Sequence, residues 1–205
     1  KDIDMTSTTS GVVPIASQNN NICTNADIDT YVRGGATYVV QAGGDDAAWT
    51  HTNVSNPANP SLVGQFIWVN FNGRPNGNTY TPDIKAFRQG ANDYIAMGLE
   101  RRTLAGFCGV VIVDVTNPAS PVIKSQYIGS TANQNLGPFW CDTHNVYVED
   151  NGAGNGEFIY ATADNSNDMR VLAVSGVYNG QTASVSNPIE IGRYIAPGAD
   201  NNNYV

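Results

Sequence analysis

The chain has 205 residues, of which 41% are hydrophobic and only 14% are charged, and its formal net charge is −8. The rarity of charged residues and the many Asn, Gly, Ser and Thr residues indicate a turn-rich, all-β protein. Ten basic residues scattered along an acidic chain lack the clustered positive charge of nucleic-acid-binding proteins. No apolar stretch approaches the roughly 20 residues of a membrane helix. We therefore expect no nucleic-acid partner and no membrane span.

Several features favour a secreted or cell-surface protein. Lysine is scarce, and Asn53 begins an Asn-Val-Ser triplet, which makes it a candidate glycosylation site. The three cysteines, Cys23, Cys108 and Cys141, match no zinc or redox spacing. The chain starts at Lys1 and shows no signal peptide, so we expect a processed chain or a fragment.

Three repeats follow one another along the chain. Residues 26–40 align without a gap on residues 82–96, and a third copy covers residues 144–148 and 158–161. Each copy consists of two short apolar runs around a Gly-bearing turn, which predicts a β-hairpin. A third strand is expected at residues 49–54, 110–115 and 170–174.

A proline opens the fourth strand of each repeat, at Pro60, Pro121 and Pro188. Each proline is followed by three residues, Gly or Ser, Gln or Arg, an aromatic residue and Ile. Near-identical Asn-Pro turns, residues 56–60 and 117–121, precede the first two prolines. We expect such a turn to join the third and fourth strands.

Four antiparallel strands per repeat predict β-propeller blades. Closed rings have about 4–8 blades, so three blades would belong to a larger or assembled ring. The expected organisation is an N-terminal segment that could complete another blade, three blades, and a linker into a further blade or a chain end. The corresponding ranges are 1–24, 25–70, 80–130, 140–196 and 197–205.

Residues 108–121, Cys-Gly-Val-Val-Ile-Val-Asp-Val-Thr-Asn-Pro-Ala-Ser-Pro, resemble the LVIVD repeat of bacterial and fungal surface proteins. Residues 144–148, His-Asn-Val-Tyr-Val, resemble the strand that opens each such repeat. The resemblance spans roughly residues 27–195, but it is close only in the second repeat. It implies a propeller on an extracellular protein, mostly without a known activity, and it supplies no catalytic motif.

The first and third strands of a propeller blade run in the same direction, so the loops before them gather on one face. Ligands commonly bind where such loops converge. Asp27, Asp83 and Asn145 occupy equivalent positions there and could bind a cation or a polyol. Capping of their own strands through hydrogen bonds to backbone is the favoured alternative. The candidates for the ligand face are Asp27, Asp83, Arg101, Arg102, Trp140, Asp142, His144 and Asn145.

Each further candidate on this face has a structural alternative. His144 beside Asp142 suggests acid–base chemistry, but a structural histidine is favoured because no nucleophile can be assigned to it. Arg101 and Arg102 could bind an anion such as a uronate or sulfate, or form a solvated pair. Trp140 could stack on a sugar or pack between blades.

Calcium is the one metal that the sequence suggests. Asp164 and Asp168 alternate with polar residues, as the ligands of calcium loops do, and backbone carbonyls would complete the site. The run lacks the Gly and the distal Glu of a full EF-hand loop, so a polar hairpin turn is favoured. No other cofactor is expected.

A disulfide is expected between Cys108 and Cys141. Cys108 stands at the start of a third strand and Cys141 stands just before the next first strand, which places both on one face of adjacent blades. Such a bridge would close a loop of about 30 residues, worth roughly 3–4 kcal/mol. Cys23 would pair elsewhere or stay free. Three buried thiols are the alternative.

The leading functional hypothesis is a non-catalytic binding or structural module with a protein or glycan partner. One alternative is an extracellular enzyme acting on polysaccharide, with His144 and Arg101 on the ligand face. Another is a fibre-forming subunit that self-assembles through an incomplete ring or exposed edge strands.

Overall fold

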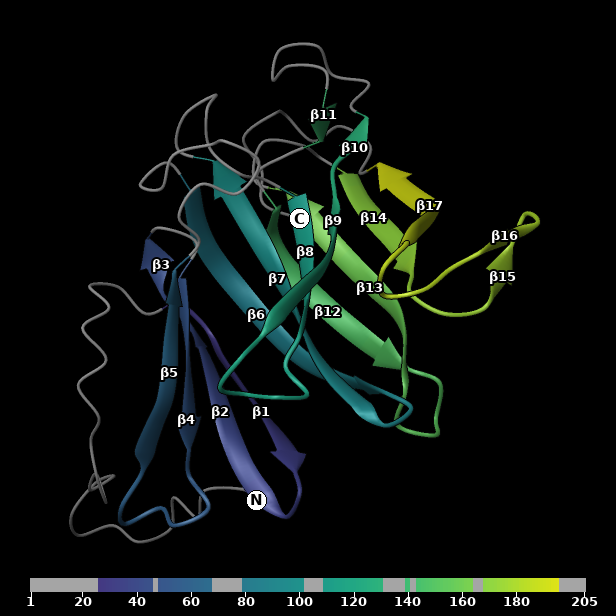
Figure 1. Cartoon of the computed structure of the whole chain (residues 1–205). Helices are drawn as coiled ribbons and strands as arrows, with labels where there is room; N and C mark the ends of the chain where they lie inside the picture. Colours follow the sequence, from purple (N-terminus) through teal and green to yellow (C-terminus); the bar gives the residue numbers. More distant parts are fainter. Residues whose placement is uncertain are drawn as a thin grey trace, which may run out of the picture.

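A computed structural model describes residues 26–45, 48–67, 79–101, 109–130, 139–140, 143–163 and 168–195. Within these residues the regular structure is entirely β-strand. Figure 1 shows three antiparallel sheets that follow one another as the colour changes from purple through teal to green. The described part of the chain has no helix of the length and hydrophobicity needed to cross a membrane.

The three sheets, named blades 1, 2 and 3 here, are each built from four strands that pair in chain order. Blade 1 consists of β1 (Ile28–Arg33), β2 (Ala36–Ala42), β4 (Ala48–Asn53) and β5 (Ser61–Ile67). Blade 2 consists of β6 (Thr79–Gln89), β7 (Asn92–Arg101), β8 (Gly109–Asp114) and β9 (Val122–Tyr127). Blade 3 consists of β12 (Thr143–Asp150), β13 (Gly156–Ala163), β14 (Asp168–Ala173) and β17 (Ile189–Ile195).

The prediction of three four-stranded antiparallel repeats is confirmed. The outermost strands β5, β9 and β17 each begin one residue after the repeated proline. Proline has no N–H to donate and is therefore tolerated at the start of an edge strand. The proline thus marks the point where each outer strand begins.

The junction between the third and fourth strands of blade 3 differs from the prediction. The expected Asn-Pro turn joins these strands in blades 1 and 2, but in blade 3 an extra hairpin lies between β14 and β17. It consists of β15 (Val177–Tyr178) and β16 (Gln181–Thr182). Asn179 and Gly180 at its tip both have positive φ, the conformation that tight hairpin turns require.

Short strand pairs also link neighbouring blades. β3 (Gly44–Asp45) lies between β2 and β4 of blade 1 in sequence but pairs with β6, so blade 2 has a fifth strand. β10 (Gly129–Ser130) and β11 (Phe139–Trp140) pair with each other between blades 2 and 3.

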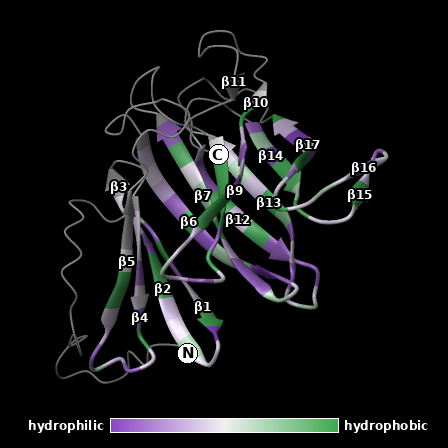
Figure 2. Cartoon of the chain, in the orientation of Figure 1, coloured by the Kyte–Doolittle hydropathy of each residue, from purple (hydrophilic) through white to green (hydrophobic). Residues whose placement is uncertain are grey.

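Two apolar cores lie between the blades. Because side chains alternate across a strand, blade 2 contributes one face to each core, and β8 is buried along almost its whole length. Figure 2 shows apolar residues along the strands of all three sheets. The core between blades 1 and 2 contains Tyr31, Val40, Ala42, Trp49, Ile84, Ile95, Met97, Leu99, Val111, Val113 and Val115. The core between blades 2 and 3 contains Phe87, Tyr94, Ala96, Val110, Ile112, Val146, Ile159, Ala161, Ala163, Leu172, Val174 and Val185.

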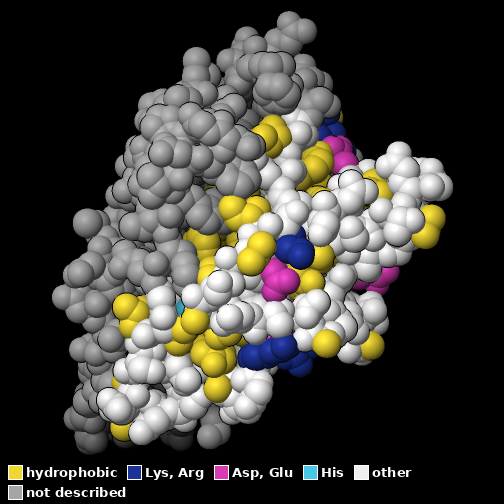
Figure 3. Space-filling view, in the orientation of Figure 1, with side chains coloured by type: hydrophobic (Ala, Val, Ile, Leu, Met, Phe, Trp, Pro, Cys, Tyr) yellow, Lys and Arg dark blue, Asp and Glu magenta, His cyan; other side chains and the backbone are white. Residues whose placement is uncertain are grey.

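The surface reflects the low charge density of the sequence. In Figure 3 the coloured part of the face shows few charged side chains. Where charged groups occur on this face, basic and acidic side chains lie close together.

Gly98 allows the first strand of blade 3 to approach blade 2 closely. A Cβ atom at this position would lie 2.9 Å from the backbone oxygen of Thr143 and 3.3 Å from that of His144. Real Cβ atoms do not approach a carbonyl oxygen this closely, so any larger residue forces the two blades apart.

His51 fills a position in the core between blades 1 and 2. Its side chain is fully buried, and Nδ1 donates to the carbonyl of Pro118 at 2.9 Å. Pro118 belongs to the Asn-Pro turn of blade 2, in which Asn117 accepts a bond from the Ala119 N–H. Burial lowers the pKa of His51 to about 4, although the bond to Pro118 acts in the opposite direction.

We predict that His51 makes the fold sensitive to acid. The folded-state pKa is about 4 against an ordinary 6.5, so the unfolded chain binds the proton more readily. The stabilising contribution is complete above pH 6.5 and is lost as the pH falls toward 4, by up to about 3 kcal/mol. Denaturant unfolding between pH 4 and 7 should show this loss in the wild type and not in His51→Gln. His144→Gln is the control, and equal pH slopes for the wild type and His51→Gln would contradict the prediction.

We predict that Gly98→Ala destabilises the chain by about 1–3 kcal/mol, because the added methyl group meets the backbone of β12. Gly192→Ala is the matched control, since its Cβ would lie 3.5 Å from a Val171 methyl carbon, an ordinary contact. Thermal unfolding of the two variants provides the comparison. Equal melting temperatures would show that the approach at Gly98 is not tight.

Candidate functional site

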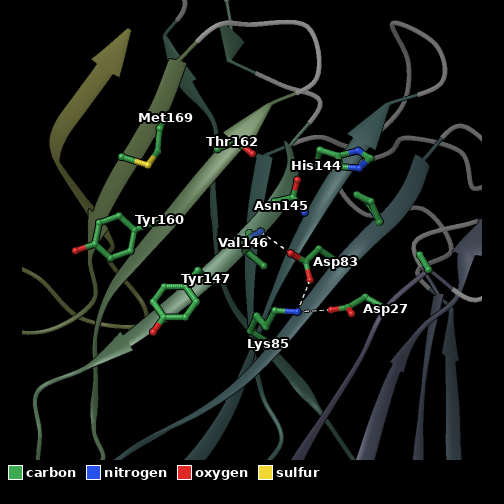
Figure 4. Close-up of a pocket in the computed structure, with 12 residues that line it drawn as sticks. Asp27, Asp83, Lys85, His144, Asn145, Val146, Tyr147, Tyr160, Thr162 and Met169 are labelled. Carbon is green, nitrogen blue, oxygen red and sulfur yellow. Dashed lines mark hydrogen bonds and ion pairs between the residues drawn. The ribbon is translucent and has the colours of Figure 1, made fainter. Parts of the chain in front are cut away.

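The starts of the innermost strands of all three blades meet at one pocket. Its volume is about 570 Å³, and Figure 4 shows its lining side chains. Asp27 precedes β1, Asp83 and Lys85 lie on β6, and Asn145 and Tyr147 lie on β12. The remaining lining residues are Ala26, Pro82, His144, Val146, Tyr160, Thr162 and Met169.

The centre of the pocket is a lysine held between two carboxylates. Lys85 Nζ lies 2.7 Å from Asp83 Oδ1 and also contacts Asp27 Oδ2. Asp27 and Lys85 expose about a third of their side chains, whereas Asp83 is almost buried. The group carries two acidic side chains and one basic side chain.

The same carboxylates bind backbone across the blade boundaries. Asp83 Oδ2 accepts a 2.7 Å bond from the N–H of Val146 in blade 3. Asp27 Oδ2 accepts a longer bond, 3.4 Å, from the N–H of Ile84 in blade 2. Asp83 Oδ1 also accepts from Ile84, as the strand-capping hypothesis expects. Both aspartates therefore hold the next blade in place in addition to lining the pocket.

The two aspartates differ in their affinity for a proton. Burial raises the pKa of Asp83, and the neighbouring Asp27 raises it further. Burial also raises the pKa of Asp27, but hydrogen bonds with Asp83 and Lys85 outweigh it and lower the net value to about 2. The Lys85 pKa is lowered by burial, but both aspartates more than reverse this, so it is raised overall. Asp27 is therefore ionised and Lys85 charged at neutral pH.

His144 lies at the rim of the pocket and is paired with Glu100. Nδ1 of His144 lies 2.5 Å from Oε1 of Glu100 at the end of β7. A third of the His144 side chain is exposed. The expected neighbour Asp142 lies outside the described residues, so the acid–base hypothesis for that pair stays a prediction.

Two tyrosines form the wall of the pocket on blade 3. The rings of Tyr147 and Tyr160 lie 6.2 Å apart with their planes tilted by 41°. Tyr147 exposes 61% of its surface, and Figure 4 shows both rings on the side opposite Asp27. The wall offers an aromatic surface beside the polar centre.

Sequence analysis anticipated part of this arrangement. Four candidates, Asp27, Asp83, His144 and Asn145, line the pocket together. Lys85 and Tyr147 were missed, although each stands two residues after a candidate and so shares its face of the strand. The pairing of His144 with Glu100 has no local signal, since 44 residues separate them.

None of the other ligand-face candidates is among the described residues that line the pocket. Arg101 ends β7 and Trp140 ends β11, but their side chains lie outside the description. Arg102, Asp142 and Asp164 lie outside the described residues, as do Cys23, Cys108 and Cys141, so the disulfide stays a prediction. Asn53 ends β4, and its side chain accepts a 2.9 Å bond from the N–H of Ser55; its glycosylation also stays a prediction.

Asp168 has strong partners within the protein. Its buried carboxylate lies 2.9 Å from Arg170 and 2.6 Å from Arg193. These guanidinium groups compete with a cation for its oxygens. In the described ranges no three His, Cys, Asp or Glu side chains are grouped to hold a metal. With Asp164 undescribed, the calcium site stays a prediction.

Comparison with known proteins supports the fold and the repeat. The LVIVD repeat family model matches residues 53–67 and 105–128. No curated protein sequence matches the chain. The C-terminal domain of PilY1 from Pseudomonas aeruginosa has a similar structure, with a TM-score of 0.54 and 14% identity over 82% of this chain. A GH43_1 enzyme from Xanthomonas citri gives a TM-score of 0.48 and 15% identity over 87% of this chain.

The chain spans 35% of the PilY1 domain and 57% of the GH43_1 enzyme. At these identities the likeness shows the fold alone. The predicted resemblance to the LVIVD repeat is confirmed for the two matched segments. The chain has β-propeller blades, and two of its segments match the LVIVD repeat.

Proposed function

We propose that this chain is a secreted or cell-surface propeller that binds a neutral glycan in the pocket at the starts of its inner strands, without catalysis. The observation that carries the proposal is the convergence of polar side chains from three blades beside an exposed aromatic wall. The scarcity of lysine, the sequon at Asn53 and the LVIVD repeats support an extracellular location.

The chemistry of the pocket suits a sugar. Hydroxyl groups both donate and accept hydrogen bonds, and the pocket offers carboxylate acceptors, the Lys85 donor and the Asn145 amide, which does both. The C–H face of a pyranose packs well on an exposed aromatic ring such as that of Tyr147. Few convergent polar groups beside apolar surface are typical of small-molecule sites.

The charge of the pocket favours a neutral ligand over an anion. The one ammonium group of Lys85 already contacts both Asp27 and Asp83. A uronate or sulfate would have to displace one of them. Recognition of an anion by Arg101 and Arg102 stays a prediction.

Binding without catalysis is favoured by the other contacts of the carboxylates. Asp83 accepts bonds from two backbone N–H groups, and Lys85 Nζ contacts both aspartates. A glycosidase pair needs its carboxyl groups on either side of the scissile bond, roughly 5–9 Å apart. Here a lysine occupies the position between them.

We predict that Tyr147→Ala weakens binding of a neutral glycan at least tenfold, about 1.4 kcal/mol, because the stacking surface is lost. The measurement is calorimetry with soluble neutral oligosaccharides chosen by an initial glycan-array screen. Tyr194→Ala is the control, since Tyr194 is also exposed, at 53%, but does not line the pocket. Unchanged melting temperatures would show that both variants fold.

Two results would contradict the proposal. One is the absence of binding to any neutral glycan on the array, and the other is equal affinity of Tyr147→Ala and the wild type.

One observation favours a hydrolase as the second candidate function. The pKa values of Asp27 and Asp83 are shifted in opposite directions, as those of an acid–base pair are. Release of reducing sugar from a polysaccharide by the wild type, abolished in Asp83→Asn, would replace the non-catalytic proposal with this one.

A further inference from the structure

A second pocket lies at the opposite end of β6 from the site described above, and its volume is about 430 Å³. It lies where the turn after β6 meets the turn after β12, and Figure 1 shows these two turns side by side. The side chains of the described residues that line it are polar and uncharged: Gln89, Asn92, Tyr94, Asn151, Asn155 and Ser175. We call it the amide pocket.

Two departures of blade 3 from the repeat meet at the amide pocket. Residues 34–35 and 90–91 join the first two strands of blades 1 and 2, whereas residues 151–155 join those of blade 3. This longer turn supplies two of the lining asparagines. Ser175 lies between β14 and the extra hairpin that replaces the Asn-Pro turn. Insertions in repeat proteins often gather on the face that binds a ligand, so their meeting here points to a binding site.

Hydrogen bonds hold the amide groups of the pocket in fixed orientations. Gln89 Nε2 donates to the carbonyls of Gly156 and Val174 at 2.7 and 3.0 Å, which leaves Oε1 as an acceptor. Asn155 Oδ1 accepts a 2.7 Å bond from the Gly90 N–H. These bonds join blade 2 to blade 3, so the amides are ordered before any ligand arrives.

The remaining polar atoms form a mixed set of donors and acceptors. Asn151 Oδ1 accepts N–H groups of its own turn, and within the described residues no hydrogen bond uses the Nδ2 group of Asn151 or Asn155. The Tyr94 hydroxyl accepts a 3.3 Å bond from Asn92 and keeps its own proton to donate. The pocket thus offers amide and hydroxyl donors beside the amide oxygens of Gln89 and Asn92.

This set fits a neutral ligand that is rich in hydroxyl groups. A hydroxyl both donates and accepts, which a mixed set of donors and acceptors requires. An ion would find no opposite charge among the described residues that line the pocket. Backbone groups of Gly90, Gly156 and Val174 are already paired with side chains, so these positions offer an extended peptide no strand edge to join.

We propose that the amide pocket binds one neutral sugar residue through hydrogen bonds to its amide groups and to the Tyr94 hydroxyl. The described linings of this pocket and of the pocket at Asp83 share no residue, so the two are separate sites. Tyr94 is only 5% exposed and gives the sugar a hydroxyl group without a stacking surface. We therefore expect weak binding, with a Kd on the order of 1 mM.

NMR titration of the isotope-labelled chain with glucose, galactose, mannose and N-acetylglucosamine tests the proposal. At least one of these sugars should cause saturable shifts of the Asn151 and Asn155 side-chain amide signals and of the Gly90 backbone amide. The same shifts should appear in Tyr147→Ala, which alters only the pocket at Asp83. The two sites can therefore be confirmed or rejected independently.

The double variant Tyr94→Phe/Asn155→Asp removes one hydroxyl donor and one amide donor from the pocket. The new carboxylate can still accept the Gly90 N–H, so the turn keeps its contact with blade 2. We expect the affinity for the sugar to fall about two- to tenfold for each lost hydrogen bond. The control Tyr194→Phe/Asn179→Asp makes the same chemical changes at exposed positions that do not line the pocket, and it should bind like the wild type.

Three results would overturn the proposal. One is the absence of saturable shifts at the amide pocket with all four sugars. Another is a larger response to trialanine or to glucuronate than to any neutral sugar, which would indicate a peptide or an anion as the ligand. The third is equal affinity of Tyr94→Phe/Asn155→Asp and the wild type, with unchanged melting temperatures showing that the variants fold.

Discussion

The inner strand of each blade pairs with only one full strand. The arrangement of the blades depends on which groups form hydrogen bonds with the N–H groups at the other edge of that strand. Unpaired N–H groups at a strand edge are costly when buried and prone to aggregation when exposed. Here acidic side chains of the preceding blade accept these bonds. Asp27 and Asp29 accept from N–H groups of β6, and Asp83 accepts from an N–H group of β12. The carboxylates thus replace the hydrogen bonds of a missing neighbouring strand.

This solution places polar groups at the pocket. The carboxylates that hold the next blade also need a counter-charge, which Lys85 supplies between Asp27 and Asp83. If the pocket binds a glycan as proposed, stability and ligand binding share the same atoms. The Tyr147 ring lies beside Tyr160 on blade 3 and is 61% exposed, so it lines the pocket without taking part in these contacts between blades.

The repeated fold could be predicted from sequence because its signals are local. Prolines, Gly-bearing turns and strand alternation recur in one order, and the structure places strands accordingly. The convergence of Asp27, Asp83 and Asn145 followed from strand direction alone. The pairing of His144 with Glu100 and the two arginines on Asp168 could not be predicted, since they depend on tertiary packing. The extra hairpin of blade 3 has a local turn signal, Asn179-Gly180, although only an Asn-Pro turn was predicted at this junction.

The most direct test of this account is amide hydrogen exchange at Val146, measured residue by residue in Asp83→Leu and Asp83→Asn. The amide oxygen of Asn can accept the same bond, so Asp83→Asn should keep the Val146 N–H protected. Asp83→Leu should lose that protection, while amides paired inside blade 2, such as Ile95, keep theirs. Equal protection of Val146 in both variants would contradict the claim that the carboxylate holds the edge of the next blade.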